Sequence, residues 1–535
     1  MVDFPRCIDR ERRRVKRKRD NINIHRNNPI QLKPFWGWKQ AFSEHSVFEV
    51  GLSIFVGILF GSLIVFSPYL PISSDFQKLI LVIPIAFTAV ILFNNLERLI
   101  LFTIAIGIPL NLDISIIISP YARNLENIAR AGYRTLITLT ELRLSLITIV
   151  LIIGYFVWFL KPRQTWKPTH FFKATTLPAI GLIFISILSV IQAQDKQLWM
   201  FRVLQLVEVF LFYFYLANHI RTTQDMKFFI VVSLMGIVAE SMLIILQWFT
   251  GLDFNILGLD ANVIGPNRAA GTLGTTGPAA GYMSVLAFIA CAMIWGLPRG
   301  PQKYLAIISL IFGTIALIAT GSRIGWIGFA ITMFAFLLIG MRSGRIKQET
   351  LLLLVIAVLI IGIGFSSVIY ERLSTFDDNS AQSRFMMWRL AWNVIKAHPW
   401  LGVGAGNYAL VSRDYYTLDV GIPAEVFDKL VHNAFLGVWA ESGTLAMLCY
   451  VSILGAAIIK AWSCTKSRSP FISLLGIGIA LGIVSLCIQM FTDTFHMRSI
   501  TLLVWALVAL ATSLPTIERV YIDTTSFSEK NADYG

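Results

Sequence analysis

Apolar runs of about twenty residues recur along this chain and constrain its fold more than any other feature. They begin near Val47 and continue to Leu514. Each run is long enough, as a helix, to cross a hydrocarbon core about 30 Å thick. The ten-residue alternating segments of a membrane β-barrel are absent, so the sequence predicts an all-α fold, a polytopic transmembrane helical bundle of about 12–14 spans. Only 14% of the residues are charged, which excludes an ordinary soluble domain.

The expected spans share length, apolar composition and polar flanks. We place them at about residues 47–66, 79–93, 99–118, 144–160, 176–193, 198–217, 228–249, 281–296, 304–320, 324–341, 351–369, 432–459, 471–490 and 498–514.

The first strongly charged segment, Arg10 to Arg19, is almost entirely basic and precedes the first apolar run. Nucleic-acid binding is one interpretation, but a basic tail before many spans favours a cytoplasmic anchor that contacts anionic lipid. We therefore expect the N-terminus inside and no nucleic-acid partner. Later loops that fall inside are also basic. The loop 119–143 disagrees, because it falls outside yet holds four arginines, so an early span is re-entrant or this loop is an interfacial helix.

This topology divides the chain into six parts and places two polar loops, 250–280 and 370–431, on the outer face. The second loop is the longest, and its residues 383–398 have apolar side chains at helical spacing, which predicts an amphipathic helix on the outer bilayer surface. The expected parts are a basic cytoplasmic tail (1–46), N-terminal spans (47–250), spans that carry arginine motifs (251–369), the long outer loop (370–431), C-terminal spans (432–514) and a cytoplasmic tail (515–535).

Metal and disulfide chemistry have no support in the sequence. The five cysteines form no CxxC pair, and clusters of histidine and carboxylate at metal-ligand spacing are absent. We therefore expect no cofactor and no metal site.

Five cationic or titratable residues reach the outer face under this topology: Arg268, Arg323, Arg384, His398 and His432. Permanent cations beside hydrocarbon normally have a specific partner. Two guanidinium groups are able to hold a diphosphate without metal, and histidine is suited to take a proton from a hydroxyl near neutral pH. The set predicts transfer from a phosphate-linked lipid donor to an acceptor hydroxyl.

Each residue also has a structural alternative. Arg268 and Arg323 are at helix ends, where arginine often extends to lipid headgroups, and Arg384 is on a helix expected to touch lipid phosphate. His398 precedes Pro399 and has a structural role as its simpler interpretation. Asn433, next to His432, is a residue that commonly caps a helix.

In order along the chain, a set of short motifs between about residues 200 and 460 resembles the O-antigen ligase and polymerase family of bacterial membrane glycosyltransferases. Two departures concern small residues only: Ala446 replaces a glycine that often closes the last motif, and Pro278-Ala279 replaces a Pro-Asn pair. The motifs are Arg268 with Gly271-Thr272, Thr320-Gly321-Ser322-Arg323, Arg384 with Trp388, His398-Pro399-Trp400-Leu401-Gly402-Val403-Gly404-Ala405-Gly406-Asn407, and His432-Asn433-Ala434-Phe435-Leu436 with Glu441-Ser442-Gly443-Thr444.

The resemblance implies a metal-independent, inverting glycosyltransferase. A polyprenyl-diphosphate carrier would donate the glycan at the periplasmic face of the bacterial inner membrane, and lipid A core, a growing polysaccharide or a protein would accept it. Arg268 and Arg323 would bind the diphosphate, and His432 would act as the general base. Arg384, His398 and Asn433 would contact substrate, and membrane lipid would surround the bundle.

A transporter or flippase of lipid-linked saccharides is the alternative. It explains many spans equally well, and Arg202 and Glu208 within the span 198–217 are in its favour. The proposed anion-binding residues gather on one face, however, which suits chemistry at that face better.

Overall fold

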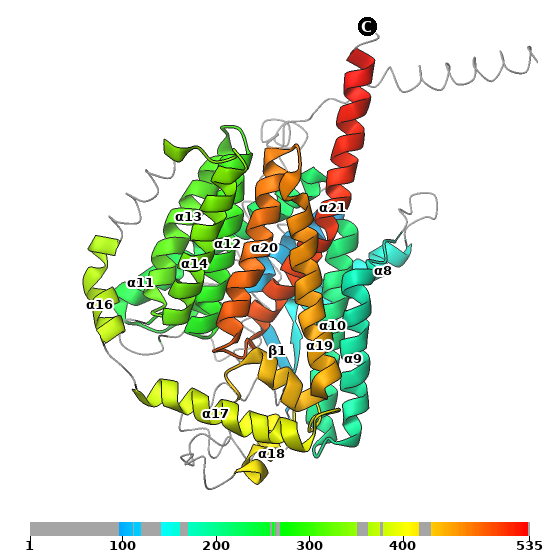
Figure 1. The fold of residues 1–535 in the computed structure, drawn as a ribbon, viewed down its shortest axis with the longest axis vertical. Helices are drawn as coiled ribbons and strands as arrows, with labels where there is room; N and C mark the ends of the chain where they lie inside the picture. The colour runs from blue at the N-terminus through cyan, green and yellow to red at the C-terminus, as the bar shows by residue number, and fades with distance from the viewer. Residues whose placement is uncertain are drawn as a thin grey trace, which may run out of the picture. The chain divides into compact units, whose positions relative to one another are not determined.

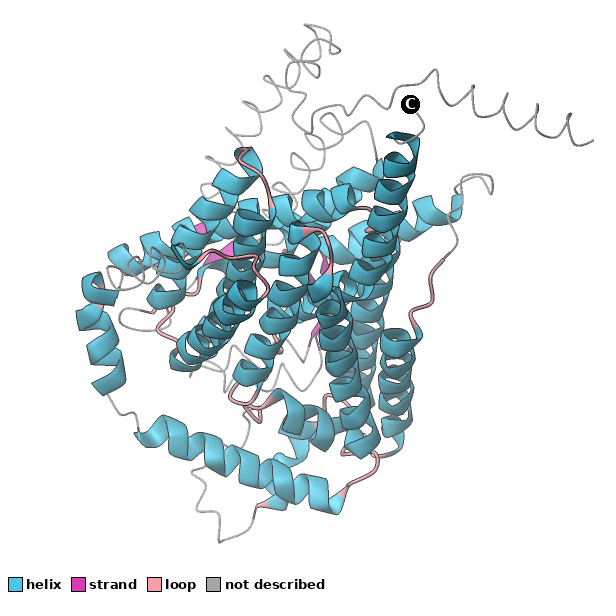
Figure 2. Cartoon of the chain, turned by 45° about the horizontal axis from the view of Figure 1, so that its top comes forward, coloured by secondary structure: helices cyan, strands magenta, loops and turns pink. Residues whose placement is uncertain are grey.

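Most of the chain that the computed structural model describes is helical (Figure 2). The structure describes residues 96–110, 112–118, 141–160, 169–256, 259–261, 263, 268–349, 362–374, 378–416 and 430–532. The expected tail 1–46 and the expected spans 47–66 and 79–93 lie outside the described residues, as does most of 351–369. Within the described part, nine helices are long and apolar enough to cross a membrane. The predicted all-α polytopic bundle is therefore confirmed.

Eight of these nine helices begin and end close to the predicted spans, and the ninth, α21, begins at the predicted residue. They are α9 (Lys173–Leu188, continued by the short turn η3, Ser189–Ile191), α10 (Lys196–His219), α11 (Thr223–Thr250), α12 (Thr276–Gly296), α13 (Pro301–Ala319), α14 (Arg323–Arg342), α19 (Ala434–Ser463, followed by η8, Cys464–Lys466), α20 (Pro470–Met490) and α21 (Arg498–Ala532). The last helix continues well past the predicted boundary at Leu514.

Three helices form the centre of the bundle. In α12, α20 and α21, 83% of the most apolar stretch is buried, against 33% in α9 and α13. Outer helices instead expose large apolar side chains such as Phe184 and Phe334, as expected of a surface that contacts lipid. α12 packs along α20, and Gly478 allows close approach, because a Cβ there would lie 3.0 Å from the carbonyl oxygen of Phe288.

The prediction of one continuous span over 99–118 is wrong. Helix α5 (Leu96–Leu110) ends just after Pro109, and β1 (Asp113–Ile118) pairs antiparallel with β2 (Glu141–Ser145), which leads into the short apolar helix α8 (Leu146–Leu160). The segment after Asp113 is rich in isoleucine, whose branched side chain favours strands. Of the loop 119–143, only its end is described, and that end is a strand.

The long outer loop contains a helix, as predicted, but its apolar face packs on protein. α17 (Asp378–Ala397) runs across the end of the bundle (Figure 1) and follows α16 (Ser366–Ser374). Ala391, Val394 and Ile395 are buried against α18 (Tyr408–Val411) and α19. Phe385 and Trp392 remain exposed, so the apolar surface of α17 is partly packed on protein and partly exposed. The turn η5 (Ser412–Tyr415) follows α18. The small pair β3 (Phe254–Ile256) and β4 (Leu259–Ala261) and the turn η4 (Gly271–Leu273) precede α12.

Candidate active site

His432 lies immediately before α19 in a strained backbone conformation. Its φ of 48° is in the left-handed region, which is costly for a residue with a Cβ. The next residue, Asn433, caps α19: its side-chain oxygen accepts hydrogen bonds from the backbone N–H groups of Phe435 and Leu436, both at 3.0 Å. Trp388 of α17 donates from its indole nitrogen to the His432 carbonyl at 3.3 Å. Contacts from two elements therefore fix the position of this histidine.

His432 interacts electrostatically with the carboxylate of Asp493, in the turn between α20 and α21. The two segments are joined by the Ala434 N–H, which donates to the Asp493 carbonyl at 3.0 Å. Burial raises the pKa of Asp493, and the charges of His432 and Arg384 oppose that shift. Phe495, two residues later, has a second left-handed non-glycine backbone, with φ 46°. Both segments therefore contain a strained backbone residue, which is His432 itself in one and Phe495 in the other.

The Asp493 carboxylate also lies against the first turn of α12. One of its oxygens contacts the Cα side of Gly277, where any Cβ would collide with it. The N-terminus of a helix stabilises a negative charge. Arg268 reaches the same turn, because its Nη2 donates to the Thr276 hydroxyl at 2.7 Å. Asp493 and Arg268 therefore share one helix terminus.

Arg323 is at the same end of the bundle as Arg268. It is the first residue of α14, and Ser322 caps that helix by accepting from the Gly325 N–H. The residue after Arg268 donates its backbone N–H to the carbonyl of Ala319, at the end of α13, at 3.2 Å. Arg323 follows that same turn between α13 and α14. The predicted gathering of both arginine motifs on one face agrees with this geometry.

His398 has a different place. Its Nε2 is 2.6 Å from the hydroxyl of Tyr415, and its backbone N–H continues the hydrogen bonding of α17. Trp388, which contacts His432, is about 15 Å away along the axis of the same helix, at 1.5 Å per residue. Arg384 belongs to the His432 end of α17, as its effect on Asp493 shows. Of the predicted residues, the structure groups Arg268, Arg323, Arg384, His432 and Asn433, and it leaves His398 apart.

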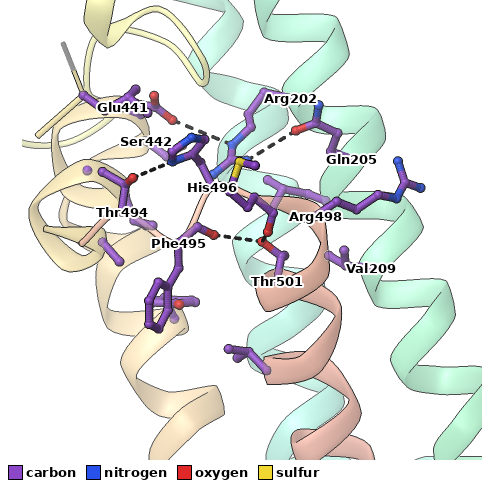
Figure 3. A pocket seen from close by; sticks show the side chains of 18 of the residues that line it. Arg202, Gln205, Val209, Glu441, Ser442, Thr494, Phe495, His496, Arg498 and Thr501 are labelled. Atoms are coloured by element: carbon purple, nitrogen blue, oxygen red, sulfur yellow. Dashed lines mark hydrogen bonds and ion pairs between the residues drawn. The ribbon is translucent and has the colours of Figure 1, made fainter. Parts of the chain in front are cut away.

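A cavity of about 160 Å³ adjoins this group and is lined mainly by residues of α9, α10, α19 and α21 (Figure 3). Residues on both sides of His432 and of Asp493 line it, including Val431 and Thr494. Arg202 of α10 faces Glu441 of α19 across the cavity, with Nε to Oε2 at 3.9 Å. Glu441 also accepts a hydrogen bond from the Gly406 N–H.

The loop of residues 399–407 connects α17 to the cavity through backbone contacts. Helix α19 is broken at Gly443, whose φ of 84° and ψ of 179° are not helical. The loop occupies this break: Val403 N–H donates to the Ala440 carbonyl at 3.0 Å, and Thr444 N–H donates to the Pro399 carbonyl at 2.8 Å. At its other end, Asn407 accepts from the Asp195 N–H at 2.7 Å, at the turn between α9 and α10.

Comparison with known protein families shows which proteins the segment around this site is similar to. Residues 308–451 match the model of a family described as O-antigen ligase. Over these residues, the chain is similar to the O-antigen ligase family. No curated protein matches the sequence. The O-antigen ligase segment runs from within α13 to within α19 and holds Arg323, Arg384 and His432, so the resemblance stated from the motifs is confirmed. The nine apolar helices and this match support a multi-pass membrane protein.

Two residues of the candidate active site lie beyond the O-antigen ligase segment. Arg268 precedes it and was predicted, whereas Asp493 follows it and was not. Asp493 and His496 occupy a short polar turn between the last two predicted spans, and this turn falls on the same outer face as His432. Its position on the outer face was the one feature of the sequence that could have indicated Asp493 as a site residue. Among the described residues, no group of three or more histidine, cysteine, aspartate or glutamate side chains is arranged to hold a metal ion.

Proposed function

We propose that this protein transfers a glycan from a polyprenyl-diphosphate carrier to a sugar hydroxyl of lipid A core or of a growing polysaccharide. The observation that carries the proposal is the position of His432 beside Asp493, at the end of the bundle where Arg268 and Arg323 also lie. A base and two guanidinium groups at one membrane face fit transfer between a lipid-linked diphosphate and an alcohol.

In this proposal, His432 accepts the proton of the acceptor hydroxyl, and Asp493 orients the imidazole and stabilises its protonated form. The hydroxyl oxygen forms a bond to the anomeric carbon while the bond from that carbon to the diphosphate oxygen breaks. Arg268 and Arg323 neutralise the departing diphosphate, the part that a metal ion takes in many other transferases. Attack from the face opposite to the leaving group inverts the anomeric centre.

The remaining predicted residues have supporting parts. Arg384 adds positive charge near Asp493 and is proposed as a further contact for phosphate or glycan. Asn433 positions His432 by capping α19, and His398 positions the end of α17 through Tyr415. We place the protein in the bacterial inner membrane with the N-terminus cytoplasmic and this end of the bundle facing the periplasm, in accordance with the basic loops of the sequence.

The test is transfer by the purified protein in detergent with EDTA and without nucleotide. A polyprenyl-diphosphate-linked glycan serves as donor, and a panel of glycans serves as acceptors. We expect elongated product, lost by at least about 100-fold in Arg268→Ala, Arg323→Ala and His432→Ala. Arg299→Ala and His170→Ala are matched controls, because both side chains are exposed. Full activity in all three site variants would refute the assignment of roles.

A flippase for the same lipid-linked saccharide is the second candidate. The charged pairs within the spans, Arg202 with Glu441 and Glu208 with Arg498, favour it, because ionisable groups inside a membrane often mark a transport pathway. Each of these charged groups has a partner of opposite charge, however, and such paired charges are also expected in a binding site that does not move. Movement of the labelled lipid across proteoliposome membranes, together with no product from any acceptor, would favour the flippase.

A further inference from the structure

The cavity between α10, α19 and α21 has features that the His432 and arginine group does not use. Two of its lining groups are buried polar atoms without a hydrogen-bond partner among the described residues: the hydroxyl of Tyr408 and Nε2 of His496. A buried polar atom left without a partner costs about 1–3 kcal/mol. Both residues line the same cavity, which gives a polar occupant a place to complete their hydrogen bonding.

The protonation state of His496 restricts which chemical groups are suited to bind beside it. Burial lowers the pKa of His496 to about 3, with further lowering by the positive charges of His432 and Arg202, so the ring is neutral at neutral pH. Its Nδ1 is 2.6 Å from the Thr494 hydroxyl. A neutral imidazole offers one donor and one acceptor, as does a tyrosine hydroxyl. Both orphaned groups therefore suit neutral hydroxyls.

The charges around the cavity disfavour a diphosphate there. Three carboxylates line it, those of Asp113, Glu208 and Glu441, against the two arginines Arg202 and Arg498. A dianion would be repelled by this excess of carboxylate. A prenyl chain would leave the polar atoms unsatisfied. A sugar ring carries several neutral hydroxyls and an apolar face, and the lining supplies aromatic surface as well, from Tyr450 and Trp505.

The size and position of the cavity agree with this choice. Its volume of about 160 Å³ holds on the order of ten water molecules, because each needs about 10–15 Å³ measured in this way. Val431 and Thr494, the chain neighbours of His432 and Asp493, line the cavity. Gly277, in the first turn of α12, lies against Asp493, and Arg268 binds the same turn through Thr276. An inverting transfer needs separate places for the incoming alcohol and for the departing diphosphate.

We propose that the cavity beside Arg202, Glu441 and His496 is the acceptor subsite, which binds the neutral terminal sugar of the acceptor and presents its hydroxyl to His432. This inference rests on the proposed function for its role in transfer. The binding of a sugar ring to the cavity does not depend on it.

Gly437 permits a direct test by filling the cavity. It lines the cavity on α19, and a Cβ built there meets nothing within 4 Å. Gly437→Leu therefore places a side chain in open space, and leucine favours helix over glycine, so folding should be retained. Gly455 is on the same helix, away from the cavity lining, and its Cβ position is equally open. Gly455→Leu is the matched control.

The experiment measures initial transfer rates with the donor and the acceptor varied in turn, using p-nitrophenyl glycosides of common hexoses as acceptor probes. We expect Gly437→Leu to raise the acceptor KM at least about tenfold and to leave the donor KM within about twofold. Gly455→Leu should change neither. Tyr408→Phe should raise the acceptor KM about fivefold, and Tyr304→Phe, at an exposed tyrosine, should not. These factors correspond to the loss of a buried contact or of one hydrogen bond.

A rise in donor KM alone, or no change in either constant, would overturn the acceptor subsite. Absence of any product from the wild-type protein would refute the proposed function instead. Calorimetric binding of the same p-nitrophenyl glycosides then decides the cavity separately: binding to wild type that Gly437→Leu abolishes supports it, and equal binding or none to both proteins refutes it.

Discussion

Replacing Gly443 by alanine should damage the protein far more than a glycine-to-alanine change within a helix usually does. The φ of 84° and ψ of 179° at Gly443 belong to a region that almost only glycine occupies, and a residue held there costs about 1–3 kcal/mol. A Cβ would also collide with the backbone carbonyl of Trp400. Such overpacking costs about 1–3 kcal/mol more. We expect Gly443→Ala to lower the free energy of unfolding by about 3 kcal/mol or more.

The matched control is Gly455→Ala on the same helix. Gly455 is helical, with nothing within 4 Å of its Cβ position, so alanine should stabilise α19 by up to about 1 kcal/mol. Unfolding in mixed micelles, titrated with SDS and followed by circular dichroism, measures both variants. The two substitutions should therefore shift the transition in opposite directions.

Activity provides the second measurement on the same variant. The break at Gly443 receives the loop of residues 399–407, which connects α17, and hence Trp388, to the rest of the bundle. Displacing that loop should lower the transfer rate even at temperatures where Gly443→Ala remains folded. Equal unfolding free energies for Gly443→Ala and Gly455→Ala would refute the assignment of the break as a docking point.

Three further outcomes are expected. Asp493→Asn should lower kcat about 100-fold with little change in KM, because a neutral amide does not stabilise protonated His432; an unchanged kcat in the transfer assay would contradict its orienting role. Because the pKa of His496 is about 3 when folded and 6.5 when unfolded, the unfolded state binds more protons between these values, and stability should fall by about 1.4 kcal/mol per unit as pH drops below 6.5. Unfolding titrations at pH 7.5 and 5 should show a smaller loss in His496→Asn than in wild type, and identical losses would contradict the burial of a neutral ring. Asn433→Ala should cost about 1 kcal/mol of stability while Asn433→Ser retains both stability and transfer, whereas loss of transfer in the serine variant would favour direct substrate contact.

The spans could be predicted because their evidence is local. Each apolar run from Lys173 onward carries its own length and polar flanks, and the structure places a helix at each run that it describes in full. The failure at 99–118 has an equally local cause. A short run such as Ile114 to Ile118 is apolar in either a helix or a strand, and only pairing with β2 decides between them.

The part of the candidate site that depends on membrane topology alone could be predicted from the sequence. Counting spans put Arg268, Arg323 and His432 on one face, and the structure places them at one end of the bundle. The partnership of His432 with Asp493 depends on how α20 and α21 pack against α12 and α19, and no pattern within the sequence of either segment encodes that contact. The same holds for the ion pair of Glu441 with Arg202, which depends on how α19 packs against α10.

The left-handed backbone of His432 opposes thermal stability to the transfer rate, because the residue proposed for transfer is costly in this conformation. Glycine adopts this conformation without penalty and asparagine with little, whereas histidine pays on the order of 1–2 kcal/mol for it. A screen for heat-resistant variants should therefore enrich glycine or asparagine at position 432, and a screen for polysaccharide output should discard the same variants. Selection for a more stable protein would have to find its gains elsewhere, at positions such as Gly455 that lie away from His432 and from the cavity lining.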